Sequence, residues 1–146
     1  MMDFDQTISM ARSAASTEEL HIEALKSFLY QSPALVFIKD YSGDSGLGVY
    51  TFVSREWERT YGFKKAQIVG KTDFDFFPKP DADKARLNDI HTLEFARAVT
   101  VMDMTGTRYS GWKPIKMNLI PMKIGPGDRW NYIAGVNLPT VQTHHE

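Results

Sequence analysis

The side chains best able to do chemistry in this 146-residue chain are a histidine and several aspartates between positions 70 and 95. Carboxylates and imidazoles are common general acids and bases, so a small isomerase or hydrolase could be built from Asp73, Asp75, Asp89 and His91. The sequence holds no nucleophile elbow, HExxH, P-loop or GxGxxG motif, which mark common enzyme classes. Helix capping also explains aspartates beside phenylalanine and proline. We therefore keep an enzyme as the weaker alternative and predict no catalytic residue.

Two further side chains in this region could hold an acidic ligand. In a helix, Arg86 and Asp89 lie three residues apart and could line the mouth of a cavity. The guanidinium of Arg86 can bind a carboxylate through two hydrogen bonds. The alternative, which we favour, is a solvated helix face on which Arg86 pairs with Asp89.

The composition excludes several kinds of site. The chain has a formal net charge of −1 and no cysteine. Such a charge argues against general attraction to nucleic acid or to an anionic membrane. The lack of cysteine excludes disulfides, iron–sulfur clusters, cysteine-ligated zinc, thiol nucleophiles and cysteinyl–flavin photochemistry. His144, His145 and Glu146 could ligate a metal, but we expect residues 141–146 to form a flexible tail, so we predict no metal site.

The chain also shows no targeting or membrane segment. Asp3 and Asp5 stand where a signal peptide has basic residues. The longest apolar run, Ala34–Ile38, is far shorter than the ~20 residues that cross a bilayer. The length fits one domain. We expect a cytoplasmic, single-domain protein.

The sequence pattern predicts the elements that must position these side chains. Ser16 and Glu19 form a capping box at the start of a helix, which Pro33 ends. Ser54 caps a second helix, and Asp81 caps the longest one. The predicted elements are helices over 16–31, 54–62, 64–69 and 81–97, a turn over 72–78, and strands over 35–39, 49–53, 98–105, 112–124 and 129–138.

This order predicts an antiparallel α+β domain, because hairpins at the two ends enclose a group of helices. On the longest helix, we expect the apolar residues to mark the buried side; they are Leu87, Ile90, Leu93 and Phe95. His91 lies beside Ile90 and one turn from Leu87, so its imidazole faces partly apolar surroundings.

The first helix carries an apolar stripe at helical spacing, made of Leu20, Ala24, Leu25, Phe28 and Leu29. The stripe has two interpretations. It packs back on the sheet of its own domain, or it packs on the equivalent helix of a partner in a homodimer. We favour the homodimer.

An ordered set of motifs resembles the PAS family, the sensory-box domains of signalling proteins. The strand Val49–Ser54 leads into Trp57 and Tyr61-Gly62-Phe63, and then into Ile68-Val69-Gly70-Lys71. The turn Thr72–Pro78, with the sequence TDFDFFP, is similar to the T-D-x-D-x-F-P turn of one subgroup. Arg86 and Asp89 match polar positions of the long helix in that family. Ile120-Pro121-Met122 and Tyr132–Val136 resemble its last hairpin, so the match covers about residues 30–140.

The chain departs from this family at three places. Ser54 stands where family members usually have asparagine, and the loop Tyr41–Gly48 is longer and richer in glycine than usual. Leu138-Pro139-Thr140 replaces the usual Asp-Ile-Thr exit triplet, which leaves the usual coupling to a downstream linker unsupported.

The resemblance implies a fold and a function. It implies a five-stranded antiparallel sheet with helices on one face, an amphipathic N-terminal helix, and a cavity between the sheet and the long helix. The expected segments are 1–31 for the N-terminal lead-in and helix, 32–140 for the sensory domain and 141–146 for the tail. The chain would be the non-catalytic sensor of a histidine kinase or diguanylate cyclase, whose output domain lies outside these residues.

In this interpretation the domain binds a small ligand in the cavity, forms a homodimer through its N-terminal helix and sheet, or does both. The alternative is a ligand-free docking or dimerisation module. The predicted cavity residues are Phe37, Phe52, Trp57, Ile68, Leu87, Ile90, His91, Leu119 and Ile133, with Arg86 and Asp89 at the polar mouth.

The resemblance leaves the cofactor open. Haem-binding members of the family use a histidine near the position of Ala85, whereas His91 lies further along the helix. Redox members hold flavin non-covalently with aromatic side chains, which Trp57, Trp112 and Trp130 could supply. We favour neither cofactor, because aromatic residues in a small domain more often form the core.

Overall fold

The computed structural model describes residues 3–6, 16–105 and 113–138 of the chain. Its centre is a five-stranded antiparallel sheet with the strand order β2-β1-β5-β4-β3. The strands are β1 (Leu35–Asp40), β2 (Val49–Val53), β3 (Val99–Thr105), β4 (Lys113–Met122) and β5 (Tyr132–Asn137). The first hairpin meets the last three strands where β1 pairs with β5. The predicted α+β class and five-stranded antiparallel sheet are confirmed.

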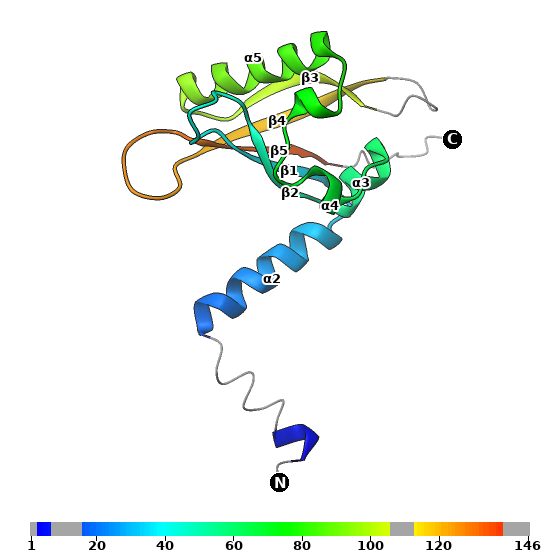
Figure 1. Ribbon diagram of the computed structural model, residues 1–146, viewed down its shortest axis with the longest axis vertical. Coiled ribbons are helices and arrows are strands. Elements are labelled where there is room, and N and C mark those ends of the chain that lie inside the picture. The colour runs from blue at the N-terminus through cyan, green and yellow to red at the C-terminus, as the bar shows by residue number, and fades with distance from the viewer. Residues whose placement is uncertain (1–2, 7–15, 106–112, 139–146) are drawn as a thin grey trace, which may run out of the picture.

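Helices cover one face of this sheet (Figure 1). They are α3 (Arg55–Tyr61), α4 (Lys65–Ile68), the 3-10 turn η1 (Asp73–Asp75) and α5 (Lys79–Phe95). The N-terminal helix, α2 (Thr17–Gln31), points away from the sheet. None of the described helices is both long and apolar enough to cross a membrane.

The limits of several elements differ from the prediction. The long helix starts at Lys79 rather than at a cap on Asp81, with Pro78 as the residue before it. Pro80 fits in its first turn, because the N–H that proline lacks has no helical acceptor there. Only four residues of the predicted helix 64–69 are helical, in α4. The strand β4 ends at Met122 rather than at 124, and β5 is shorter than predicted at both ends. Trp112 lies outside the described residues.

The predicted helix cap at Ser54 is confirmed, and the same side chain also makes contacts with a distant strand. Its side-chain oxygen accepts a hydrogen bond from the N–H of Trp57 at 3.2 Å, which caps α3. The same oxygen accepts from the N–H of Val36 at 2.9 Å and donates to the carbonyl of Ala34 at 3.0 Å. The side chain is fully buried. Ser54 therefore joins the start of α3 to β1.

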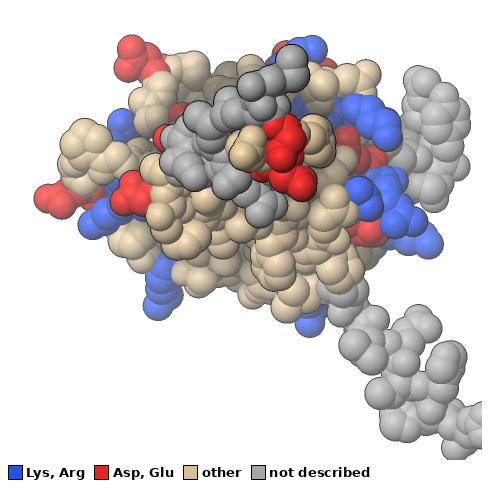
Figure 2. Space-filling model, turned by 90° about the horizontal axis from the view of Figure 1, so that it is seen from below, with Lys and Arg blue, Asp and Glu red and all other residues tan. Residues whose placement is uncertain are grey.

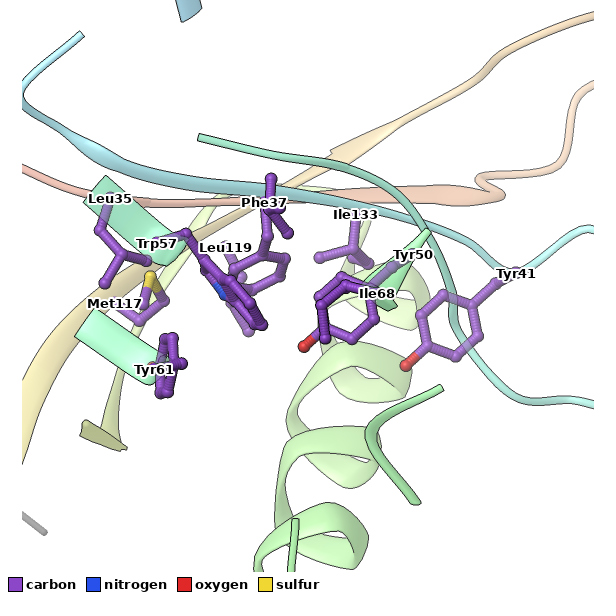
Figure 3. Packing of buried hydrophobic residues seen from close by; sticks show 11 residues of the cluster. Leu35, Phe37, Tyr41, Tyr50, Trp57, Tyr61, Ile68, Met117, Leu119 and Ile133 are labelled. Atoms are coloured by element: carbon purple, nitrogen blue, oxygen red, sulfur yellow. The ribbon is translucent and has the colours of Figure 1, made fainter. Parts of the chain in front are cut away.

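The core has one layer on each face of the sheet. The larger cluster lies under the helices (Figure 3) and is formed by Leu35, Phe37, Tyr41, Tyr50, Val53, Trp57, Tyr61, Ile68, Met117, Leu119 and Ile133. The smaller cluster is formed by Ala34, Val36 and Phe52, against which Leu29, Tyr30, Ile38 and Val136 pack. Only the last turn of α2 takes part in it. The rest of the predicted apolar stripe of α2 does not pack on its own domain, and Phe28 is 70% exposed.

A close contact between β1 and β5 fixes the packing at the centre of the sheet. Phe37 lies opposite Gly135 in the register of these strands, and its ring covers the glycine backbone. A Cβ atom at Gly135 would lie 2.1 Å from Cζ of Phe37. Only glycine leaves room for this ring, which is itself buried in the larger cluster.

We predict that Gly135→Ala lowers the free energy of unfolding by about 1–3 kcal/mol, because the Phe37 ring must move within a packed core. Urea unfolding followed by tryptophan fluorescence measures the loss. The matched control is Gly43→Ala, since a Cβ there meets nothing within 4 Å; its effect should stay within about 0.5 kcal/mol. Equal stabilities of the two variants would contradict the proposed packing.

Candidate functional site

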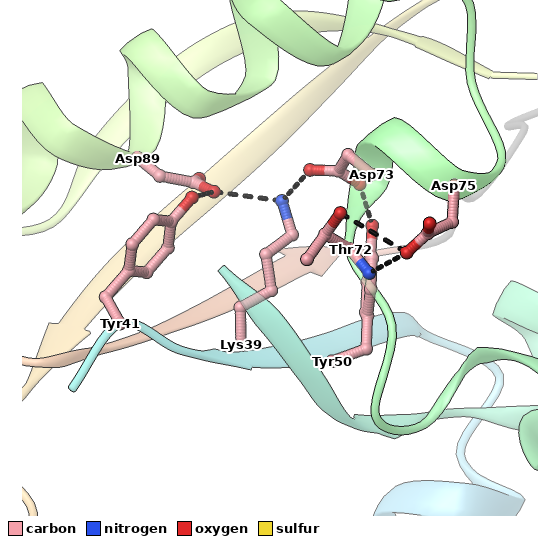
Figure 4. Close-up of polar contacts among 7 residues, drawn as sticks. All are labelled: Lys39, Tyr41, Tyr50, Thr72, Asp73, Asp75 and Asp89. Carbon is pink, nitrogen blue, oxygen red and sulfur yellow. Dashed lines mark hydrogen bonds and ion pairs between the residues drawn. The ribbon is translucent and has the colours of Figure 1, made fainter. Parts of the chain in front are cut away.

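A lysine ammonium is buried between the sheet and the helices (Figure 4). Nζ of Lys39 donates to Oδ2 of Asp73 at 2.6 Å and to Oδ2 of Asp89 at 2.9 Å. The hydroxyl of Tyr41 donates to the same oxygen of Asp89 at 2.5 Å, and the hydroxyl of Tyr50 donates to Oδ1 of Asp73. Lys39 is only 2% exposed, and both aspartates are buried. We refer to these five residues as the Lys39 network.

The alternation of β1 explains how a lysine comes to lie in the core. Leu35, Phe37 and Lys39 share the face of the strand that the helices cover. Tyr50 lies opposite Lys39 on β2, next to an irregularity in the register between Ile38 and Lys39. Two adjacent strands thus present an ammonium and a phenol to the same space.

Two helical elements bring the carboxylates to this lysine. In η1, the N–H of Thr72 donates to Oδ2 of Asp75 at 2.8 Å, and this closes the turn that directs Asp73 inward. In α5, the buried residues are Ala82, Asp89 and Thr92, which share one helix face at spacings of seven and three. The Lys39 network therefore ties β1 to both η1 and α5.

Burial and charge shift the proton affinities of the Lys39 network. Burial alone lowers the pKa of Lys39, but the charges of Asp73 and Asp89 outweigh it and hold that pKa well above its usual value. Burial raises the pKa of Asp89, with Lys39 opposing the rise and Asp73 adding to it. Burial and the adjoining carboxylates also raise the pKa of Tyr41 and of Tyr50. At neutral pH, Lys39 is charged and both phenols keep their protons.

A cavity of about 30 Å³ borders the Lys39 network. Three members of the network line it together with aromatic rings; among the described residues the lining is formed by Phe37, Lys39, Tyr50, Trp57, Tyr61, Asp73, Phe77, Asp81, Ala85 and Asp103. The rings are in contact with one another: Trp57 and Tyr61 have centroids 4.7 Å apart, and Tyr61 and Phe77 have centroids 5.5 Å apart. The cavity therefore combines aromatic rings with the charged side chains of Lys39 and three aspartates.

The structure places the predicted cavity residues in different parts of the domain. Phe37 and Trp57 line the cavity. Ile68, Leu119 and Ile133 belong to the same core cluster without lining the cavity, and Ile90 packs against that cluster. Phe52 lies in the cluster on the opposite face of the sheet. Leu87, which is 53% exposed, and His91 lie on the outer side of α5.

The prediction for α5 was wrong because this helix buries polar residues. Leu87 and Phe95 were expected on the buried side and are exposed. Asp89 lies in the interior on Lys39 rather than at a polar mouth or in a pair with Arg86. Arg86 instead donates from Nε to the carbonyl of Gly46 at 3.0 Å. Counting apolar residues alone therefore gave the wrong face of the helix.

Sequence reasoning did not name Lys39, Tyr41 or Tyr50 as site residues, and it considered Asp73 only as an acid or base of the weaker enzyme alternative. One signal was present in the sequence. Lys39 follows Leu35 and Phe37 at a spacing of two, so a strand that buries those residues must also direct the lysine inward. A buried lysine requires partner carboxylates, and five aspartates of the helical region, including those at 73 and 89, were candidates.

The cavity fits neither haem nor flavin. Its volume of about 30 Å³ is far below the ~300–1,000 Å³ of pockets that enclose drug-sized ligands. His91 does not line it and instead faces the Phe95 ring, with centroids 6.4 Å apart. Trp130 stacks under Lys123 away from the cavity. Within the described residues, no group of three or more histidine, aspartate or glutamate side chains could hold a metal ion.

Comparisons with known proteins agree with this architecture. No protein-family model matches the chain, and no curated protein matches it by sequence. A LOV protein from Rhodobacter sphaeroides matches in structure with a TM-score of 0.62 and 17% identity, over 80% of this chain and 65% of that one. A PAS domain from Colwellia psychrerythraea matches with a TM-score of 0.60 and 12% identity, over 80% of this chain and 95% of that domain.

The chain has a PAS fold. VqmA of Vibrio cholerae shares this fold, with a TM-score of 0.62 and 21% identity over 86% of this chain and 53% of that protein. The chain thus spans about two thirds of the Rhodobacter protein and about half of VqmA. The cavity described above lies between the sheet and the helices of this PAS fold.

We predict that Lys39→Met lowers the free energy of unfolding by about 3–5 kcal/mol, because it leaves two buried carboxylates without a cation. Urea unfolding at neutral pH measures the change. The control is Lys79→Met, which removes the exposed pair of Lys79 with Asp83 and should cost about 0.5 kcal/mol or less. A loss for Lys39→Met no larger than that of the control would contradict the network.

Proposed function

We propose that this PAS domain is the sensory part of a cytoplasmic signal-transduction protein of the histidine kinase or diguanylate cyclase type. It binds a small ligand beside the Lys39 network and passes a structural shift to an output domain that lies outside these residues. It has no catalytic role of its own and does not bind nucleic acid. The observation that carries the proposal is a cavity with a buried ammonium in its wall.

The mechanism follows from what the Lys39 network connects. A ligand that binds beside Lys39 contacts β1 directly and reaches η1 and α5 through Asp73 and Asp89. If it binds one arrangement of these elements better than another, it shifts the population towards that arrangement. The strand β1 follows α2 after three residues, so a change in β1 is transmitted to the N-terminal helix.

One structural neighbour supports a ligand of this kind. VqmA has been solved in a complex with a compound called DPO, and it matches this chain with a TM-score of 0.62 and 22% identity. That binding belongs to VqmA, and it supports here the proposal that a PAS fold of this shape can enclose a small molecule.

The alternative is a ligand-free dimerisation or docking module of the same fold. The small volume of the cavity favours it, because 30 Å³ is about the space of one water molecule in the liquid. The two functions differ in what the purified protein carries.

Dimerisation is the second part of the proposal. The helix α2 exposes Leu25 and Phe28, which are 62% and 70% accessible. Figure 2, seen from the side opposite α5, shows an area without charged side chains over the lower middle of this face. A second copy of the chain would cover the stripe of α2 and part of this face. VqmA, which shares the fold, forms a dimer, and this supports dimerisation without indicating the surface used.

Native mass spectrometry of freshly purified protein tests ligand binding. We expect a complex heavier than the chain by the mass of one small molecule, which solvent extraction releases. The denatured sample, which gives the mass of the chain alone, is the control. Protein that carries no added mass after expression in several media would contradict ligand binding and leave the ligand-free module.

We predict that Phe28→Glu weakens the dimer about tenfold or more, because the contact would bury an unpaired carboxylate. Analytical ultracentrifugation over a range of concentrations measures the dissociation constant. Ser27→Glu adds the same charge beside the apolar stripe and should leave the dimer intact. A wild-type monomer at high concentration, or equal effects of the two substitutions, would contradict dimerisation through α2.

A further inference from the structure

A groove beside the last turn of α2 carries an excess of positive charge. Among the described residues it is lined by Tyr30, Arg55, Glu58, Arg59 and Lys64, and we refer to it as the Tyr30 groove. Its carboxylate is already engaged, because Oε1 of Glu58 accepts from the hydroxyl of Tyr30 at 2.6 Å and Oε2 accepts from the N–H of Lys65 at 2.7 Å. The groove therefore offers three cations to a partner.

These cations are accessible and weakly neutralised. Arg55, Arg59 and Lys64 are exposed. Arg59 pairs with Glu56 at 3.7 Å, and the other two form no ion pair with a described carboxylate. Arg55 lies over the ring of Tyr30, 5.4 Å from its centroid. An acidic segment is the complementary partner for such a surface.

The first half of α2 is acidic and lacks a partner of its own. Glu18, Glu19 and Glu23 are exposed, and no lysine or arginine lies between positions 17 and 25. None of these glutamates pairs with a described cation. They lie far from the Tyr30 groove of their own chain, because α2 points away from the sheet (Figure 1) and Glu19 precedes Tyr30 by about 16 Å along the helix.

The apolar stripe of α2 is centred on a small residue. Leu20, Ala24 and Phe28 follow one another at intervals of four, so they share one side of the helix. Ala24 is the middle residue of α2, and its methyl group lets a second helix approach closely there. A two-fold axis at Ala24 makes two such helices antiparallel, and it places Leu20 of each copy level with the partner's Phe28.

The same axis brings the acidic half of α2 to the Tyr30 groove. Glu19, Glu23 and Tyr30 follow one another at intervals of four and seven, so they share the side of α2 next to the stripe. With the axis at Ala24, Glu19 of one copy lies level with the partner's last helical turn, where the groove begins. Parallel helices would instead place each glutamate beside its own copy, and like charges repel.

We propose that the Tyr30 groove receives the acidic start of α2 from a second copy of this chain. The two α2 helices then run antiparallel, and Glu19 of each copy lies beside the partner's Arg59 and Lys64. This rests on the proposed dimerisation, and it identifies the receiving surface and the orientation of the helices.

A reversal of charge on both sides of the contact tests this proposal. Glu19→Lys and Arg59→Glu, each alone, should weaken the dimer about fivefold or more, because the symmetry repeats the lost pair at both ends of the interface. The full chain with both substitutions should dimerise within about twofold of the wild type. Analytical ultracentrifugation at low ionic strength measures the dissociation constants. Losses that add up in the double variant would overturn the proposal.

Glu18→Lys is the matched control. It makes the same change of charge in the same first turn of α2, so its cost to the helix is similar. Glu18 lies about 100° around the helix from Glu19, away from the side shared with Tyr30. The dimer should keep its affinity in this variant. A loss as large as that of Glu19→Lys would contradict docking through this side of α2.

Disulfide trapping reports the orientation directly, because the chain has no cysteine of its own. Leu20→Cys and Phe28→Cys variants are mixed and oxidised, and mass spectrometry identifies the linked pairs. Antiparallel helices give the mixed pair of the two variants. Parallel helices give each variant linked to itself, which would overturn the proposal.

The outcomes separate this inference from the function on which it rests. If the wild type is a dimer but links form only between like variants, dimerisation holds and the proposed docking is wrong. If the wild type is a monomer at high concentration, both are wrong.

Discussion

The ion pairs of Lys39 with Asp73 and Asp89 are the interaction on which the rest of this domain depends. Moving an ammonium and two carboxylates out of water costs several kcal/mol for each ion, and the cost is offset only where the geometry is close and further hydrogen bonds are made. Both conditions hold, because the contacts are 2.6 and 2.9 Å and Tyr41 and Tyr50 donate to the same carboxylates. The arrangement therefore fixes where η1 and α5 lie against β1.

This constraint also shapes the cavity. Residues of the larger cluster hold the helices on the sheet by apolar contact, but such contact has no direction. The hydrogen bonds of the Lys39 network are directional. They fix polar side chains in the cavity wall beside the rings of Trp57 and Tyr61. In the proposed function, a ligand beside these polar side chains would change the position of β1, η1 and α5.

The sequence predicted the parts of the fold that follow from local rules. The α+β order, the cap at Ser54 and the start of α2 at Ser16 depend on a few neighbouring residues, and all are present in the structure. The inward face of α5 depends on partners far away in the chain. Asp89 lies inward only because Lys39, fifty residues earlier, neutralises it there. For the same reason Leu87, which looks like a core residue on periodicity alone, is exposed.

The charge state of Lys39 is the most direct measure of this account. The pKa of its ammonium should lie well above the usual value because Asp73 and Asp89 hold the proton. Direct ¹⁵N NMR of the lysine side chains across an alkaline titration gives this pKa. The Lys39 signal should still show an ammonium when the pH has passed about 10.4, where a free lysine is half deprotonated. Loss of the proton at or below that pH would contradict it.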